Sequence, residues 1–259
     1  MLQGNQHKLW IINVQNQVCY IDDEQQVNAV SEEGFASDIA ISEGGVIWAL
    51  SSTPDPDGGG AEIAWLDRHQ TWHTISHGSG AFEITGGRKD QCVYRTSSGA
   101  LHTIDTQGMG GNICDTYSVR SMDCGGGMVW ALLSDRTGGI PQLHYAEFSE
   151  SLQWNKFAGI QNPTSISVND RGECMGIQGY MPFEYQLPGG VQRLDARICP
   201  PALQVSFKSN LYLLSAHPTR HGNAIYEWNE SGDGFWMDTG LKGKRILSTY
   251  YSNTSASLT

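Results

Sequence analysis

Aromatic side chains beside charged ones recur along this chain, and that combination suits the binding of sugars. A pyranose packs its C–H face on an aromatic ring, while its hydroxyl groups need carboxylate, amide or guanidinium partners. Ten residues are therefore candidates for carbohydrate binding: Asp57, Trp65, Trp72, Arg136, Tyr145, Trp154, Arg220, Tyr226, Trp228 and Trp236. Packing between structural elements is the competing explanation, above all for Trp72, Trp154 and Trp236.

Patterns typical of catalysis are mostly missing from the sequence. It has no Gly-x-Ser-x-Gly elbow, phosphate-binding loop, His-Glu-x-x-His motif or paired-cysteine zinc motif. Residues 231–236 partly match a turn of some propeller glycosidases, but Phe235 stands where that turn needs glycine. His69, His73 and His77 are spaced by four, which in a strand separates them by about 13 Å, too far for one metal ion. We therefore expect no catalytic residue, no metal and no cofactor.

Composition limits the classes of partner. The chain has 259 residues and a formal net charge of -11, with 27 Asp and Glu against 16 Lys and Arg. A surface of that charge repels phosphate backbones and anionic headgroups, so neither nucleic acid nor membrane insertion is expected. The first residues lack the layout of a secretory signal, and no apolar run is long enough to span a membrane. These features predict a soluble protein with a cytoplasmic location.

Cysteine usage indicates free thiols. The six cysteines have no paired spacing, and several lie within probable strands: Cys19, Cys92, Cys114, Cys124, Cys174 and Cys199. This pattern predicts buried, reduced thiols in a reducing compartment, with a bridge between Cys114 and Cys124 as the main alternative.

The candidate residues must be positioned by a repeated unit, because aromatic residues recur at intervals of 82. Trp48, Trp130 and Tyr212 form one such set, and Trp72, Trp154 and Trp236 form another. Each unit divides into two halves of short, alternating apolar runs separated by Gly, Asn, Asp and Ser. Such runs are typical of antiparallel strands joined by tight turns. The sequence thus indicates three units of two similar halves.

The repeat predicts an all-β fold, a six-bladed β-propeller of four-stranded antiparallel blades with pseudo-threefold symmetry. Residues 1–259 form a single domain in this interpretation. The last blade combines the C-terminal stretch 245–251 with three N-terminal stretches (8–14, 17–22 and 25–30). Pairing of the two ends closes the ring and leaves no exposed sheet edge between them.

Three long polar connections are expected between the second and third strands of alternate blades. They cover residues 52–60, 134–141 and 215–223 and would lie on one face in a threefold arrangement. Recognition often involves loops on a rigid scaffold, although Pro, Gly and Asp are also ordinary turn formers. The three connections differ in charge, so any three equivalent sites have diverged.

Two stretches resemble tectonin-type repeats. Residues 36–52, ASDIAISEGGVIWALSS, are similar to the core line of those repeats, and residues 222–246, GNAIYEWNESGDGFWMDTGLKGKRI, are similar to the line that follows. Weaker forms recur in the other units, so the resemblance spans nearly the whole chain. It implies a propeller of the tectonin-repeat lectin family, with glycans or glycoconjugates as partners.

From these features we expect a multivalent lectin that is not an enzyme, because repeated weak sites gain avidity on clustered glycans. The alternative is a non-enzymatic protein-protein interaction scaffold with a protein partner, which the divergence of the three connections favours. A propeller glycoside hydrolase is the third interpretation.

Overall fold

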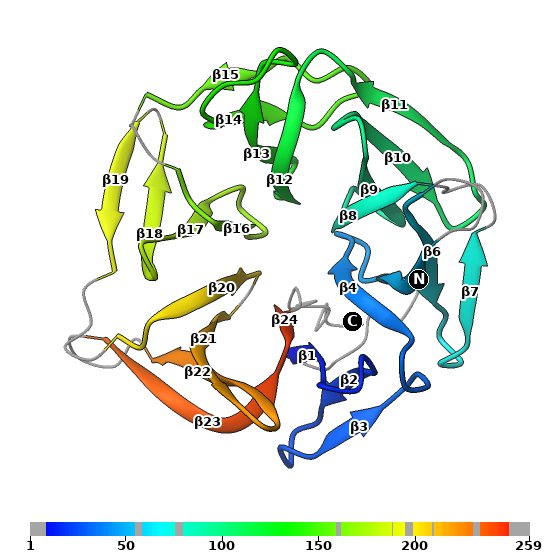
Figure 1. The fold of residues 1–259 in the computed structure, drawn as a ribbon, viewed down its shortest axis with the longest axis vertical. Coiled ribbons are helices and arrows are strands. Elements are labelled where there is room, and N and C mark those ends of the chain that lie inside the picture. Colours follow the sequence, from blue (N-terminus) through cyan, green and yellow to red (C-terminus); the bar gives the residue numbers. More distant parts are fainter. Residues whose placement is uncertain are drawn as a thin grey trace, which may run out of the picture.

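The regular elements of the described chain are β-strands, which are arranged in a ring (Figure 1). The computed structural model describes residues 9–54, 59–75, 80–158, 162–187, 189–194, 199–208, 210–229 and 234–248. Every strand pairs antiparallel with its neighbours, as short alternating segments joined by tight turns require. The predicted all-β propeller is confirmed in this respect.

Four sheets contain four strands each. The closing sheet has the order β24 (Arg245–Ser248), β1 (Leu9–Ile12), β2 (Val18–Ile21) and β3 (Val27–Ala29). The next has β12 (Ser118–Gly125), β13 (Met128–Ser134), β14 (Gln142–Glu147) and β15 (Asn155–Lys156). A third has β16 (Ser165–Val168), β17 (Cys174–Gln178), β18 (Met181–Gln186) and β19 (Gly190–Arg193). The fourth has β20 (Ala202–Phe207), β21 (Leu211–Thr219), β22 (Gly222–Asn229) and β23 (Phe235–Gly243).

The remaining eight strands form one larger sheet. One group is β4 (Ala36–Ile41), β5 (Ile47–Pro54), β6 (Ala61–Leu66) and β7 (Trp72–Ile75), and the other is β8 (Ala81–Gly86), β9 (Gln91–Thr96), β10 (Leu101–Asp105) and β11 (Gly110–Cys114). A single residue pair between β6 and β8, Ala61 with Ala81, joins them. The expected count of six separate blades therefore differs from the structure, which has four four-stranded sheets and one eight-stranded sheet. The close approach of Gly60 to Gly80 permits this junction, because a Cβ on Gly60 would lie 2.2 Å from the Gly80 carbonyl carbon.

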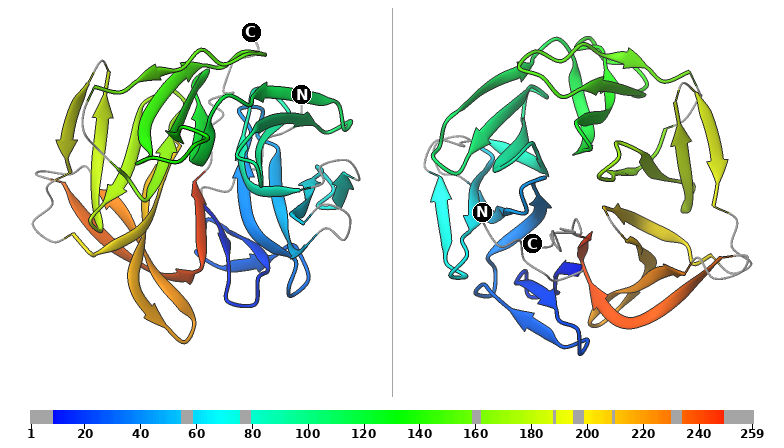
Figure 2. Two further views of the ribbon diagram at one scale, coloured as in Figure 1. Left: turned by 45° about the horizontal axis from the view of Figure 1, so that its top comes forward. Right: turned by 180° about the vertical axis from the view of Figure 1, so that it is seen from behind.

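The ring is closed by both ends of the described chain, as the sequence predicts. Strand β24 pairs with β1 over four residue pairs, from Leu9 with Ser248 to Ile12 with Arg245. Figure 1 shows this red strand beside the blue N-terminal strands, and Figure 2 shows the same closure from behind. Backbone hydrogen bonds between the two ends remove the sheet edge that an open ring would expose.

Apolar side chains fill the space between consecutive sheets. Each of six buried clusters combines residues from two neighbouring four-strand groups. The repeated aromatic residues on the second strands belong to these clusters, because Trp48 and Trp130 are 0% exposed and Tyr212 is 3% exposed. Their predicted role in packing is confirmed, and the period of 82 residues reflects a repeated core position.

Six inner strands line the centre of the ring: β4, β8, β12, β16, β20 and β24 (Figure 1). Each inner strand is the edge of its sheet or group, so part of its backbone has no strand partner. Side chains of the preceding inner strand accept several of these N–H groups. Glu83 accepts from Met122 at 3.2 Å, Ser167 from Phe207 at 2.9 Å, and Ser206 from Ser248 at 2.7 Å. Polar residues on the inner strands thus hold neighbouring sheets in register.

The connections between second and third strands differ from the sequence expectation. The register of β4 with β5, which pairs Ala36 with Ser51, places these connections at the end of the ring where inner strands begin. The segment 215–223, expected as a loop, is mostly strand, because β21 and β22 pair as far as Thr219 with Gly222. The segment 135–141 is a loop, as expected, and part of the first connection, 55–58, lies outside the described residues.

Candidate functional site

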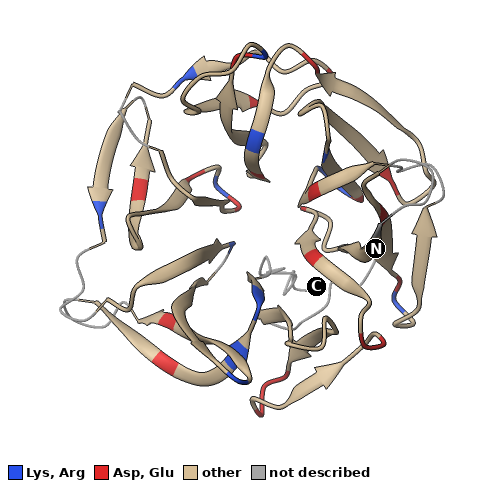
Figure 3. Cartoon of the chain, in the orientation of Figure 1, with Lys and Arg blue, Asp and Glu red and all other residues tan. Residues whose placement is uncertain are grey.

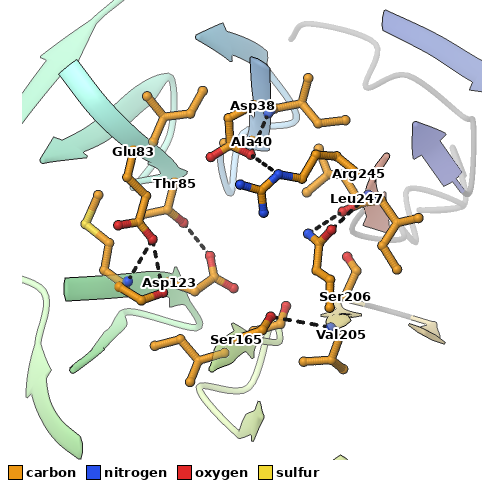
Figure 4. Close-up of a pocket in the computed structure, with 18 of the residues that line it drawn as sticks. Asp38, Ala40, Glu83, Thr85, Asp123, Ser165, Val205, Ser206, Arg245 and Leu247 are labelled. Carbon is orange, nitrogen blue, oxygen red and sulfur yellow. Dashed lines mark hydrogen bonds and ion pairs between the residues drawn. The ribbon is translucent and has the colours of Figure 1, made fainter. Parts of the chain in front are cut away.

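The centre of the ring contains a polar cavity of about 320 Å³ (Figure 4). Residues from all six inner strands line it, so no single sheet forms the site. This volume is at the lower end of the range for small-molecule sites, about 300 to 1,000 Å³. The size suits one small ligand.

The floor of the cavity is a buried lysine. Lys208, which directly follows β20, is 3% exposed, and its Nζ donates to Asp123 Oδ2 at 2.8 Å, to the Cys124 carbonyl at 2.8 Å and to the Val168 carbonyl at 2.7 Å. Asp123 also accepts hydrogen bonds from the Thr85 hydroxyl and, at 2.6 Å, from the Val168 N–H. These contacts join four sheets at the ends of their inner strands, and they hold the ammonium group where its three donors are satisfied.

Glycines allow the inner strands to converge at this end. A Cβ on Gly86 would lie 1.6 Å from the carbonyl oxygen of Ile41, and one on Gly125 would lie 2.3 Å from that of Asn169. Gly86 ends β8 and Gly125 ends β12, so neighbouring backbones approach closely at the ends of these two inner strands.

Two carboxylate–guanidinium pairs also line the cavity. Glu83 Oε2 lies 2.9 Å from Arg95 Nε, while Glu83 Oε1 accepts from the Ser121 hydroxyl at 3.0 Å. Asp38 Oδ1 lies 3.7 Å from Arg245 Nε, a looser contact in which the arginine side chain is 47% exposed. Burial raises the pKa of Asp38 and the pKa of Glu83 above their usual values, and the neighbouring arginines oppose that effect.

β-Bulges add side chains at the start of four inner strands. The pairing register shifts between Ala81 and Glu83 in β8, and equivalent shifts surround one residue each in β4, β12 and β20. The bulged residues of three strands line the cavity, namely Phe82, Arg120 and Leu203. A bulge leaves its extra residue without a cross-strand partner and re-aims its side chain. The mouth of the cavity, by which we mean the end where the inner strands begin, therefore gains three side chains that a regular strand would not place there.

The charge of the lining contrasts with that of the whole chain. Seven ionisable residues line the cavity: Asp38, Glu83, Asp123, Arg95, Arg120, Lys208 and Arg245. Four cations thus face three carboxyl groups, whereas the full sequence has 27 acidic against 16 basic residues. Figure 3 shows red segments on β4 and β8 and blue segments on β12 and β24 at the inner wall. The lining of the cavity thus has a small excess of cations in a protein that is acidic as a whole.

The ten residues predicted to bind carbohydrate do not line this cavity. Nine of them are described, and they lie on outer strands and connections around the rim, while Asp57 lies outside the described residues. Trp65 stacks on His73, with ring centroids 4.6 Å apart, and Tyr145 packs against Trp130 at 5.3 Å. Tyr226 and Trp228 pack against the cluster between the third and fourth four-stranded sheets. Arg136 and Arg220 are exposed in turns.

The three tryptophans at the second repeat position make packing contacts. Trp72 Nε1 donates to the Val30 carbonyl at 2.8 Å, and Trp154 Nε1 contacts Cys114 Sγ at 3.3 Å. Trp236 is 7% exposed and lies within 5.0 Å of Trp228, centroid to centroid. Each ring is thus held against neighbouring side chains, which agrees with the packing explanation.

Cysteines contribute no reactive group to the described site. All six are free, five of them buried and Cys199 half-buried, so the alternative bridge between Cys114 and Cys124 is absent. Burial raises the pKa of Cys19 to about 11 and raises that of Cys92 as well, which keeps these thiols protonated. Among the described residues, no group of three or more His, Cys, Asp or Glu side chains is arranged to hold a metal ion.

Sequence reasoning missed the cavity because it followed aromatic residues and loops. A usable signal was present in the first strands of the repeated halves, where polar residues alternate with apolar ones. Glu83 and Thr85 are spaced by two, as are Ser165 and Ser167, which puts both members of each pair on the same strand face. Once those strands are placed innermost, that face must line the centre of the ring.

Comparisons with known proteins show the fold. No protein-family model matches this chain, and no curated protein matches it, so the resemblance to tectonin-type repeats is not confirmed. TolB from Acinetobacter baumannii is similar in structure, with a TM-score of 0.68 and 12% identity, over 93% of this chain and 66% of TolB. This chain thus spans just under two thirds of that protein.

Two enzymes are also similar in structure. One is a gluconolactonase from Xanthomonas campestris, with a TM-score of 0.58 and 9% identity over 82% of this chain and 84% of that protein. The other is a catalytically inactive virginiamycin B lyase from Staphylococcus aureus with quinupristin, with a TM-score of 0.57 and 10% identity over 93% and 88%. At these identities the likeness establishes a β-propeller and nothing about activity.

One further property concerns membranes. No helix in the described part of the chain is long and apolar enough to cross a bilayer.

Proposed function

We propose that this protein binds one small, hydroxyl-rich ligand, such as a monosaccharide, in its central channel. The observation that carries the proposal is the polar cavity of about 320 Å³, lined by every inner strand. Carboxyl groups, guanidinium groups and side-chain hydroxyls alternate around its wall. Such a lining supplies both donors and acceptors, which hydroxyl groups need, and would be costly to bury against an apolar ligand.

An aromatic ring at the mouth supports the same ligand class. Phe82 is 45% exposed and lines the cavity from the bulge of β8. Its ring offers an apolar surface next to the Glu83–Arg95 pair, the pairing of ring and polar group that a pyranose requires. The sequence-based expectation of carbohydrate binding is thereby kept, but the site moves from the rim to the centre.

A single central site replaces several equivalent ones in this proposal. The lining residues at matching positions of the inner strands differ in chemistry, for example Asp38, Ser165 and Gln204. Unequal walls around one axis favour one asymmetric ligand. Multivalent binding of glycans at the rim and a protein partner remain predictions.

We infer binding without catalysis. Asp123, Glu83 and Asp38 each accept hydrogen bonds from backbone N–H groups of inner strands, so each holds the wall in place. Because a lactonase and a lyase are similar in fold, any binding experiment should also test whether the ligand is converted. Conversion of a bound sugar, followed by NMR, would replace binding with catalysis.

We also interpret the eight-stranded sheet as two blades, which restores six blades around the axis. Support comes from the single residue pair that joins β6 to β8 and from the apolar cluster that lies between the two halves. Under this interpretation the cavity has six walls, one from each blade.

A matched pair of phenylalanine variants tests the site. Phe82→Ala removes a ring that is 45% exposed in the cavity lining, and Phe235→Ala removes a ring that is 44% exposed on the outer strand β23. Titration of monosaccharides by saturation-transfer NMR should show binding that Phe82→Ala weakens by about two- to tenfold, since a stacked ring contributes about 0.5 to 1.5 kcal/mol. Phe235→Ala should bind as the parent does. Binding that fails only in Phe235→Ala or Trp228→Ala would place the site at the rim and contradict the proposal.

A further inference from the structure

We propose that the ligand of the channel carries a carboxylate group, and that Arg120 binds it. This inference rests on the proposed function and deepens it, because it changes the ligand class from neutral sugars to sugar acids. It follows from an imbalance between the cations and the carboxyl groups of the cavity wall.

Three of the four lining cations already have a carboxylate partner. Arg95 pairs with Glu83 at 2.9 Å, Lys208 with Asp123 at 2.8 Å, and Arg245 with Asp38 at 3.7 Å. Within the described chain, Arg120 has neither an ion pair nor a side-chain hydrogen bond. Among the described residues, Arg120 is thus the lining cation that has no carboxylate partner.

The backbone explains why this side chain is placed at the mouth. In β12 the register passes from Val119 with Leu133 to Ser121 with Leu132, so Arg120 is the bulged residue. The residues on either side have other contacts. Val119 is buried in the core, and the Ser121 hydroxyl donates a hydrogen bond to Glu83. The bulge leaves Arg120 without a cross-strand partner, and Arg120 is among the residues that line the cavity.

A carboxylate is the chemistry that fits this position. Guanidinium presents a planar fork of donors that matches a carboxylate with two parallel hydrogen bonds, and such charge-assisted bonds are stronger than neutral ones. The surrounding walls do not compete strongly for the arginine, because Glu83 and Asp38 already contact Arg95 and Arg245. A carboxylate at Arg120 would bring the lining to four cations and four anions.

Apolar side chains in the lining limit what else the ligand contains. Phe82 and Leu203, the other bulged residues of the lining, are each 45% exposed. Strands β8 and β20 face each other across the ring, as do β12 and β24 (Figure 1). The ligand that suits this mouth has one anionic end for Arg120, a body that touches Phe82 and Leu203, and hydroxyls directed at the polar wall below.

Glucose and glucuronate form a matched probe pair, because they differ in one carbon that is a hydroxymethyl group in one and a carboxylate in the other. Calorimetric titration of the full chain should show glucuronate binding about tenfold tighter than glucose, the effect of one charge-assisted contact. Raising the salt concentration from about 0.05 M to about 0.5 M should weaken glucuronate binding more than glucose binding.

The variant Arg120→Gln should remove the preference for glucuronate, so that the ratio of the two affinities falls to near one. The control is Arg171→Gln, which changes an arginine that is 75% exposed in the turn 170–173, at the opposite end of the inner strands. It should keep the preference. Near-ultraviolet circular dichroism of both variants checks that the ring is intact.

The outcomes separate this inference from the proposed function. Equal affinities of the parent for the two sugars, or a preference that survives in Arg120→Gln, would overturn the carboxylate inference while central sugar binding stands. If neither sugar binds the parent protein, the proposed function and the inference that rests on it both fail.

Discussion

The channel and the rim use similar residue types for different purposes. On the rim, aromatic rings pack into the clusters between sheets. The indole N–H groups of Trp72 and Trp154 have partners in the preceding four-strand group, the Val30 carbonyl just after β3 and Cys114 Sγ at the end of β11. In the channel, polar side chains and one exposed ring face a cavity that no part of the described chain fills. A residue's distance from the propeller axis, more than its type, therefore distinguishes residues of the core from residues of the candidate site.

Removal of a rim tryptophan should have the largest effect on stability. Trp236→Ala should lower the free energy of unfolding by about 3 to 5 kcal/mol, because it empties a packed position that is 7% exposed. Denaturant unfolding measures the change. The neighbouring variant Met237→Ala is the control, since Met237 is 43% exposed on the same strand and should change stability by less than about 0.5 kcal/mol. Loss of sugar binding in a Trp236→Ala protein of unchanged stability would reverse the assignment of rim and channel.

Loss of the lysine at the channel floor should have the next largest effect. Lys208→Met leaves Asp123, which is 13% exposed, without its cation, and breaking a buried pair costs about 3 kcal/mol or more. Asp123 retains hydrogen bonds from Thr85 and Val168, so we expect the lower end of that range.

The matched change Arg171→Met disrupts an exposed pair with Glu173 and should cost less than about 1 kcal/mol. Urea titrations of the two variants give the comparison directly. Equal stability of Lys208→Met and Arg171→Met would show that loss of the cation at the channel floor costs no more than loss of one at the surface.

The smallest effect is expected when a carboxyl group is removed from the channel or from the rim. The stability of the two variants, relative to the parent, should change with pH in opposite directions. Burial raises the pKa of Glu83 above its ordinary value of 4.5, so the native state binds more protons than the unfolded state above that pH. Its contribution to stability therefore falls as pH rises from 4.5 through the folded pKa. Glu83→Gln stays neutral, so its stability relative to the parent should rise as the pH rises from 4.5 through the folded pKa of Glu83.

Asp67, on the rim, should behave in the opposite way. A hydrogen bond from His73 at 2.9 Å, with backbone donors, lowers the pKa of Asp67 to about 2. Its stabilising contribution is present above its ordinary value of 3.8 and is lost as pH falls toward 2. Asp67→Asn should thus lose stability relative to the parent at neutral pH and regain it in acid. If stability relative to the parent changes with pH in the same direction for the Glu83 and Asp67 variants, the predicted difference between channel and rim carboxyl groups is wrong.

Local periodicity predicted much of the fold. Alternating apolar runs identified the strands, the interval of 82 residues identified Trp48 and Trp130 as equivalent, and the apolar runs at both ends identified the closing sheet. Each of these features can be recognised from residues close together in the sequence or from a repeated spacing. The joined sheet was missed, because the pairing of Ala61 with Ala81 depends on how closely Gly60 approaches Gly80.

An all-β ring in which bulky residues recur at core positions can be predicted from the amino-acid sequence, because strand pairing and apolar burial follow from short-range patterns. Which polar residues share a site depends on the arrangement of the strands in space. Asp38, Glu83, Arg120 and Arg245 come from four separate inner strands, up to 207 positions apart in sequence, and meet because closure of the ring brings those strands around one axis. Arg120 also depends on the bulge in β12, which leaves this lining residue without a cross-strand partner.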